Sequence, residues 1–248
     1  MNESTPTPLE RVEATGNLQA LQRDPDKVIR SERFDALHQN YGTQFEAHEL
    51  ASRIKGLYEE LETTYNISVP ADFVVDTDVE GNTVLATAVD RIDGVNLNEA
   101  EYSQQLAEKV ERLYTSVAQY LFDKNQKGGY FLCDINSMSQ YMYGTRKGDV
   151  EPNIYLVDTD AYFNSNRKGL YLVIEWLCRH MSGAERLCHT KFSDARNYIQ
   201  QFLNEPLPVD VSDDEKDDIR YSMLNITAFL HGEKFGPAPE IAIPVFNK

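Results

Sequence analysis

Amphipathic periodicity predicts most of the helices in this chain. Between Phe45 and Tyr65, apolar residues recur at spacings of four, three and four, while charged residues fall mostly on other faces. A similar apolar stripe predicts a second long helix over residues 98–123. Residues 170–181 (LYLVIEWLCRHM) would be apolar on almost every face of a helix, which indicates a helix buried in a core.

Shorter helices are predicted elsewhere. One covers residues 31–40 and another residues 192–203. A third begins in the acidic run 210–218, which carries six acids against one lysine, and continues to about residue 230. Ser212 and Glu215 have the spacing of a capping box, so the acids are expected in the first turn of this helix. The alternative is that this run is a docking surface for a basic protein partner.

Turn residues and alternation predict the strands. In residues 9–33, Thr15-Gly16-Asn17 and Asp24-Pro25-Asp26 read as turns that separate three short strands. Residues 71–76 and 83–92 read as a hairpin joined at 78–82, and Asp93-Gly94 reads as a connector. Residues 1–8 are expected to be a loose tail, and the proline-rich residues 236–248 an extended strap.

The chemistry is concentrated in residues 130–163. Two short apolar runs, 130–133 and 154–157, each end directly on an aspartate, Asp134 and Asp158. If the runs are adjacent strands, their two carboxylates converge where a metal ion or a proton acceptor would act. The alternative is that each carboxylate only caps the turn that follows its strand.

The order of these elements predicts an α+β protein. Strands and one long helix come first, two more strands follow, and the rest is mainly helical. We expect a disordered tail (residues 1–8), a small β-rich N-terminal lobe (9–94) and a larger helical C-terminal lobe (95–248).

Composition narrows the class of partner. The formal net charge is −16, which argues against nucleic acid because phosphate backbones are bound by clustered Lys and Arg. The same charge repels free ATP, so a nucleotide site would need a local cation or Mg²⁺. The sequence has no apolar run of membrane-spanning length, no signal-peptide pattern and an odd number of cysteines, three. We therefore expect a cytoplasmic protein without a membrane partner or a disulfide framework.

The order of elements and a few short motifs resemble the protein-kinase-like fold, including the aminoglycoside and choline kinases, over roughly residues 10–230. KVIR (27–30) resembles the third strand of the small lobe, where Arg30 takes the place of the usual phosphate-binding lysine. The helix from Phe45 resembles the one whose glutamate pairs with that basic residue. Glu46 is the better match for this glutamate, and Glu49 is the alternate. Residues 83–97 resemble the strand and hinge that hold the adenine.

The central stretch carries the rest of the resemblance. Leu132-Cys133-Asp134 is similar to the start of a catalytic loop, which implies that Asp134 is the catalytic base. Gln140 lies one residue beyond the usual place of a metal-binding asparagine; a purely structural amide is the alternative. Residues 156–160 (LVDTD) resemble the Mg²⁺-binding aspartate segment, which implies Asp158 and Asp160 as metal ligands.

Taken together, the resemblance implies a divergent phosphotransferase that uses ATP and Mg²⁺, bound between two lobes, on a small-molecule or protein hydroxyl. Three departures favour the alternative of a catalytically inactive kinase-like (pseudokinase) binding or scaffold protein. A glycine-rich loop is missing, Leu132-Cys133 replaces the basic residue and histidine before the catalytic aspartate, and no Ala-Pro-Glu-like segment follows Asp160.

Overall fold

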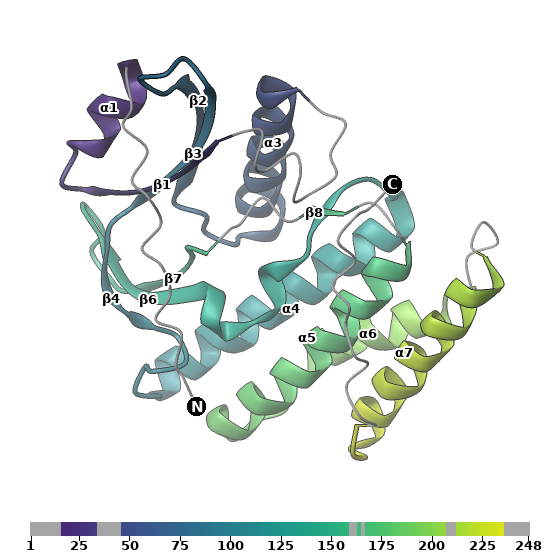
Figure 1. Cartoon of the computed structure of the whole chain (residues 1–248). Coiled ribbons are helices and arrows are strands. Elements are labelled where there is room, and N and C mark those ends of the chain that lie inside the picture. Colours follow the sequence, from purple (N-terminus) through teal and green to yellow (C-terminus); the bar gives the residue numbers. More distant parts are fainter. Residues whose placement is uncertain (1–15, 34–45, 159–162, 165–166, 207–211, 236–248) are drawn as a thin grey trace, which may run out of the picture. The chain divides into compact units, whose positions relative to one another are not determined.

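The computed structural model describes residues 16–33, 46–158, 163–164, 167–206 and 212–235 (Figure 1). It is a mixed α+β structure in which helices outweigh small antiparallel sheets. The chain divides into two compact units. Of the described residues, the smaller unit contains those up to residue 53 and residues 71–91, and the larger unit contains residues 54–70 and those from residue 92 onward. No helix in the described part of the chain is long and apolar enough to cross a bilayer.

The smaller unit contains a three-stranded antiparallel sheet in the order β1-β3-β2, formed by β1 (Lys27–Arg33), β2 (Ala71–Thr77) and β3 (Thr83–Asp90). The predicted hairpin of β2 and β3 is confirmed. Its turn forms because the buried Asp78 carboxylate accepts the backbone N–H groups of Glu80 and Asn82 at 2.9 and 2.8 Å. Gly81, at φ +85°, supplies the left-handed backbone that the turn needs.

Two predictions in the smaller unit are wrong. Residues 16–22 form a helix, α1 (Gly16–Gln22), which packs on β1 and β2, where a strand was expected. Leucine, alanine and glutamine, which make up residues 18–22, all favour a helix. Residues 31–33 continue β1, not a helix, because they extend the ladder with β3 to Arg33 opposite Val84. The predicted strand before residue 15, the rest of the 31–40 helix and both chain ends lie outside the described residues.

Helix α3 (Ala47–Tyr65) confirms the first amphipathic prediction. Its apolar stripe of Leu50, Ile54, Leu57 and Leu61 is buried throughout. The helix starts within the smaller unit and ends within the larger one.

The larger unit is built on long helices, α4 (Gln104–Lys127), α5 (Arg167–Cys188), α6 (Ser193–Asn204) and α7 (Asp213–His231). Helix α4 packs on α5 and α6, and α7 packs on α5 and α6 (Figure 1). The apolar segment 170–181 lies inside α5, as predicted. The capping box at the start of α7 is also confirmed, since Ser212 accepts from the Glu215 N–H and Glu215 accepts from the Ser212 N–H.

The second long helix begins later than predicted. Residues 98–103 lie before α4. The N-cap of α4 is Ser103, and its side-chain oxygen accepts the Leu106 N–H at 3.2 Å. A serine oxygen that satisfies an otherwise unpaired N–H defines a helix start more sharply than apolar spacing does. At the other end, Gly128 has φ +73° and closes the helix.

The described part of the larger unit also contains two small sheets. Strands β4 (Ile92–Asn96), β6 (Tyr141–Arg146) and β7 (Asn153–Leu156) form one, in the order β4-β6-β7, and β5 (Phe131–Leu132) pairs with β8 (Phe163–Asn164) in the other. Asp93-Gly94 is therefore strand, and the connector predicted there is wrong. Gly94 pairs with Gly144, and a Cβ on either would lie 2.2–2.3 Å from the opposite backbone oxygen. Two glycines let these strands approach closely.

Candidate functional site

The β6–β7 hairpin positions two of the predicted site residues. Tyr141 pairs with Leu156, so the residues just outside the ladder, Gln140 and Val157, also face each other. The backbone oxygen of Gln140 accepts the N–H groups of Val157 and Asp158 at 3.0 and 3.2 Å. Residues 18 positions apart in the chain are thus brought together by the register of one hairpin.

The side chains of Gln140 and Asp158 also meet. With the amide nitrogen of Gln140 turned toward Asp158, it donates to the Asp158 backbone oxygen at 3.2 Å and to Oδ2 at 3.1 Å. This orientation is the one that the surrounding acceptors select. If the Gln140 amide rotates by half a turn, its side-chain oxygen takes the place of its nitrogen. The Gln140 oxygen and Asp158 Oδ2 then face each other, as two oxygen ligands do around a bound cation.

The oxygens of Asp158 and Gln140 are of the kinds that Mg²⁺ takes as ligands. The ion prefers carboxylate and amide oxygens and usually keeps several waters beside one or two protein ligands. Asp158 and Gln140, both half-buried, offer such oxygens next to a sheet. The described residues contain no group of three or more His, Cys, Asp or Glu arranged to hold a metal ion. Asp160, the other predicted ligand, lies outside the described residues.

Asp134 opens a short 3₁₀ helix, η1 (Asp134–Asn136), which is followed by η2 (Met138–Gln140). Its side chain is half-buried, whereas Cys133 before it and Ile135 after it are buried. Burial, and then the Asp134 charge, raise the pKa of the Cys133 thiol far above its usual range. Cys133 is therefore a packing residue at neutral pH, and Asp134 is the residue of this pair that can act as a proton acceptor.

The strands that precede Asp134 and Asp158 are not neighbours, so the strand adjacency expected for them is wrong. The strand before Asp134, β5, pairs with β8, and the strand before Asp158, β7, pairs with β6, so the two strands belong to different sheets. The connection between the two regions is the η1–η2 segment, which runs from Asp134 directly to Gln140. Convergence of the two carboxylates stays a prediction.

Several residues that the sequence reasoning missed hold the η1–η2 segment in place. The buried Tyr141 hydroxyl donates to the Ile135 oxygen at 2.7 Å, and Asn136 donates to the Val173 oxygen of α5 at 3.3 Å. Just before the segment, the Leu132 N–H donates to the Tyr120 hydroxyl of α4 at 3.1 Å. The only sequence signal was a tyrosine in an apolar stripe, which normally indicates core packing.

The predicted phosphate-binding residues lie in the smaller unit. Arg30 is exposed on β1, opposite Thr87 of β3, and Glu46 is exposed just before α3, where its backbone oxygen accepts the Leu50 N–H at 2.9 Å. The alternate, Glu49, pairs with Arg53 one turn along the same helix at 2.8 Å. A pairing of Arg30 with Glu46 stays a prediction.

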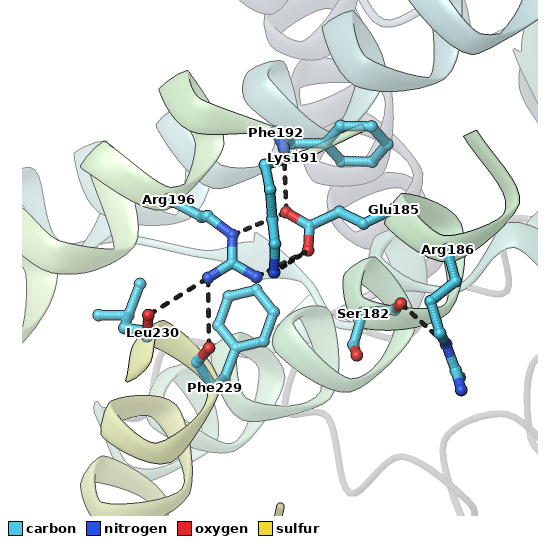
Figure 2. A network of polar contacts seen from close by, with 8 residues as sticks. All are labelled: Ser182, Glu185, Arg186, Lys191, Phe192, Arg196, Phe229 and Leu230. Atoms are coloured by element: carbon cyan, nitrogen blue, oxygen red, sulfur yellow. Dashed lines mark hydrogen bonds and ion pairs between the residues drawn. The ribbon is translucent and has the colours of Figure 1, made fainter. Parts of the chain in front are cut away.

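A second carboxylate cluster in the larger unit is built differently (Figure 2). The buried Glu185 of α5 accepts from Arg196 of α6 through Nε and Nη2, both at 2.7 Å, and from the Phe192 N–H at 2.9 Å. Lys191 adds a charge at 3.7 Å. We call Glu185, Lys191, Phe192 and Arg196 the Glu185 cluster.

The Glu185 cluster joins three helices. Arg196 also donates through Nη1 to the Phe229 and Leu230 oxygens at the end of α7, at 3.2 and 3.5 Å (Figure 2). Burial on its own would raise the pKa of Glu185, but the Arg196 and Phe192 hydrogen bonds and the nearby cations outweigh it and hold the pKa below its usual value. With these contacts made, the cluster is a structural clamp.

No protein-family model matches this sequence, and no curated protein sequence matches it.

Proposed function

We propose that this chain is a divergent kinase-like protein that transfers a phosphoryl group from ATP to a small-molecule or protein hydroxyl. The observation that carries the proposal is the meeting of Gln140 and Asp158 at the end of the β6–β7 ladder. These are the residues that the resemblance implies as metal ligands, and they were identified there from short motifs alone.

The order of elements also supports the proposal. A strand (β1), a long helix (α3) and an antiparallel pair (β2, β3) occur in the order that the resemblance implies. After helix α4, a short strand leads into the segment with Asp134, and a hairpin leads into Asp158.

Each residue has a role in this proposal. Mg²⁺ would be held by Asp158, Gln140 and Asp160. When bound, the ion neutralises the charges of the phosphate groups. Asp134 would accept the proton of the attacking hydroxyl. Arg30 would pair with phosphate oxygens through its guanidinium, and Glu46 would orient Arg30.

A titration with ATP, with and without Mg²⁺, tests binding. A ligand at about 100 times its Kd raises the free energy of unfolding by about 2.7 kcal/mol. We expect an Mg²⁺-dependent rise in Tm that is lost in Asp158→Asn. The matched control is Asp217→Asn, which removes the same charge from an exposed position on α7 and should keep the rise. An unchanged Tm at saturating ATP contradicts the proposal.

Phosphoryl transfer is tested separately with Asp134→Asn. A general base typically contributes about 10²–10⁴ in rate, so turnover should fall by that factor while ATP binding stays the same. If the chain binds ATP but transfers no phosphate, and Asp134→Asn changes neither result, the protein is not an enzyme of this kind. The second candidate function, described next, would then be favoured.

The second candidate is a kinase-like binding or scaffold protein without catalysis. Helix α1 favours it, because Gly16–Gln22 is helical where a strand and a phosphate-cradling turn would be needed. In the described residues of the smaller unit the sheet has three strands, and none of its turns is rich in glycine.

A further inference from the structure

A small polar pocket in the larger unit contains two cations and no carboxylate. It has a volume of about 220 Å³ and is formed by the loop after α3, by residues 109–116 of α4 and by the start of β7. Its polar lining consists of Asn66, Ser68, Lys109, Arg112, Ser116 and Asn153. None of the described residues around it is Asp or Glu, although the chain has 40 acids against 24 Lys and Arg.

The two cations are held by main-chain oxygens. Lys109 Nζ donates to the Pro152 oxygen at 2.9 Å, and Arg112 Nε donates to the Glu108 oxygen at 3.3 Å. Within the described part of the chain neither residue forms an ion pair. The two Nη groups of Arg112 make no hydrogen bond to any described residue. These two N–H₂ groups of the guanidinium are therefore available to a ligand.

A larger pocket in the same unit, about 430 Å³ in volume, is a weaker candidate. It too has cations, but Arg196 is used by Glu185 and by the end of α7 (Figure 2). Arg186 lies in the last turn of α5, where a cation offsets the negative end of the helix dipole, and Lys191 faces Glu185 at 3.7 Å. Glu233 lines it as well, so its charges are explained without a ligand.

We propose that the pocket at Lys109 and Arg112 binds a phosphate group, either inorganic phosphate or a small phosphate ester. A guanidinium binds phosphate through two parallel N–H groups, and an ammonium adds a point charge. The Ser68 and Ser116 hydroxyls and the Asn66 and Asn153 amides supply further donors. The volume lies below the ~300–1,000 Å³ of pockets for larger ligands, which favours a small anion over a nucleotide.

A phosphate in this pocket would join three elements. The Ser68 oxygen already accepts the Leu156 N–H of β7 at 2.9 Å, and Asn153 donates to the Ser68 hydroxyl at 3.3 Å. Bound phosphate adds a bridge from this loop and β7 to α4. Because β7 leads directly to Asp158, the bridge stabilises the strand that supports the proposed metal ligand. The site itself does not depend on the proposed phosphotransfer.

Phosphate binding is measured on the full chain by ³¹P NMR titration, and by Tm in sodium phosphate against sodium chloride at equal ionic strength. The test variant is Lys109→Gln/Arg112→Gln. The matched control is Lys216→Gln/Arg220→Gln, which removes two charges from α7, away from the pocket. We expect the control to bind like the wild type and the test variant to bind at least tenfold more weakly, a loss of about 1.4 kcal/mol.

Further variants and ligands identify which group binds and where. Arg112→Lys keeps the charge but loses the fork, and should bind more weakly than the wild type. Asp158→Ala should keep phosphate affinity, which separates this pocket from the proposed Mg²⁺ site. Glycerol phosphate against inorganic phosphate distinguishes an ester from the free ion. Equal affinity in the test and control variants, or no response at tens of millimolar phosphate, overturns the proposal.

Discussion

Two carboxylates of the larger unit, Glu185 and Asp158, differ in the neighbours that face their charge. In the Glu185 cluster, the side chain is 5% exposed and faces two cations and a backbone N–H. In the pair formed by Asp158 and Gln140, the carboxylate is half-buried and faces an amide. The first charge joins three helices, whereas the second lies at the end of a hairpin.

The difference gives a way to test which of the two carboxylates is structural. A guanidinium can only donate, so Arg196 fixes Glu185 in one arrangement. A glutamine amide can present either its nitrogen or its oxygen, so Gln140 is able to face Asp158 as a donor or as an acceptor. Substitutions in the two clusters, and in the sheet that supports the second, test whether this contrast holds.

The largest effect is expected at the clamp. Glu185→Ala leaves the buried Arg196 without its charge partner, and breaking a buried pair costs about 3–5 kcal/mol. Urea unfolding measures the loss. The comparison variant, Asp158→Ala, should lose less, because its carboxylate is only half-buried and therefore less desolvated than that of Glu185. Equal losses would mean that Asp158 is also structural.

A smaller effect is expected in the sheet that builds the second cluster. Gly144→Ala forces a Cβ to within 2.3 Å of the Asp93 oxygen, so β4 and β6 must separate. Overpacking of this kind costs about 1–3 kcal/mol.

A matched glycine provides the control for that variant. Gly183 lies inside α5, and a Cβ added there would have nothing within 4 Å, so Gly183→Ala should raise stability by about 0.5–1 kcal/mol. Thermal or urea unfolding of both variants compares them. Similar effects in the two would contradict the close approach of Gly94 and Gly144.

Gln140→Ala should cost about 0.5–1.5 kcal/mol, because it removes the amide that faces Asp158 but no charge partner. Urea unfolding measures this loss. If the pair holds a cation, the same variant should also weaken the Mg²⁺-dependent ATP response. Loss of stability with an unchanged response would assign Gln140 a structural role only.

The smallest effect is a pH dependence that belongs to the clamp. The folded-state pKa of Glu185 is held below its usual value, so its contribution is complete above about pH 4.3 and is lost as pH falls through the lower folded value. The stability gap between the wild type and Glu185→Gln should therefore narrow between about pH 5 and pH 2. If the stability difference between the wild type and Glu185→Gln grows as the pH falls, the pKa of Glu185 is raised in the folded state and not lowered.

Local sequence signals predicted the long helices and the β2–β3 hairpin well. The stripe of Leu50, Ile54, Leu57 and Leu61 and the Ser212–Glu215 box each act within a few turns of one helix, so neighbouring residues carry the information. Predictions failed where tertiary packing decides. Residues 16–22 had too little periodicity to distinguish a strand from a helix that packs on a sheet.

The sequence by itself determined which residues carry the proposed chemistry: Asp134, Gln140 and Asp158 could be named from short motifs. Only the tertiary structure decided how they are arranged. The register of β6 and β7 brings Gln140 to Asp158, and β5 and β7 lie in different sheets. The Glu185–Arg196 pair and the cations of the small pocket could not be predicted from the sequence either. Strand pairing and helix packing bring together residues that are far apart in the chain, and such pairs produce no periodic pattern.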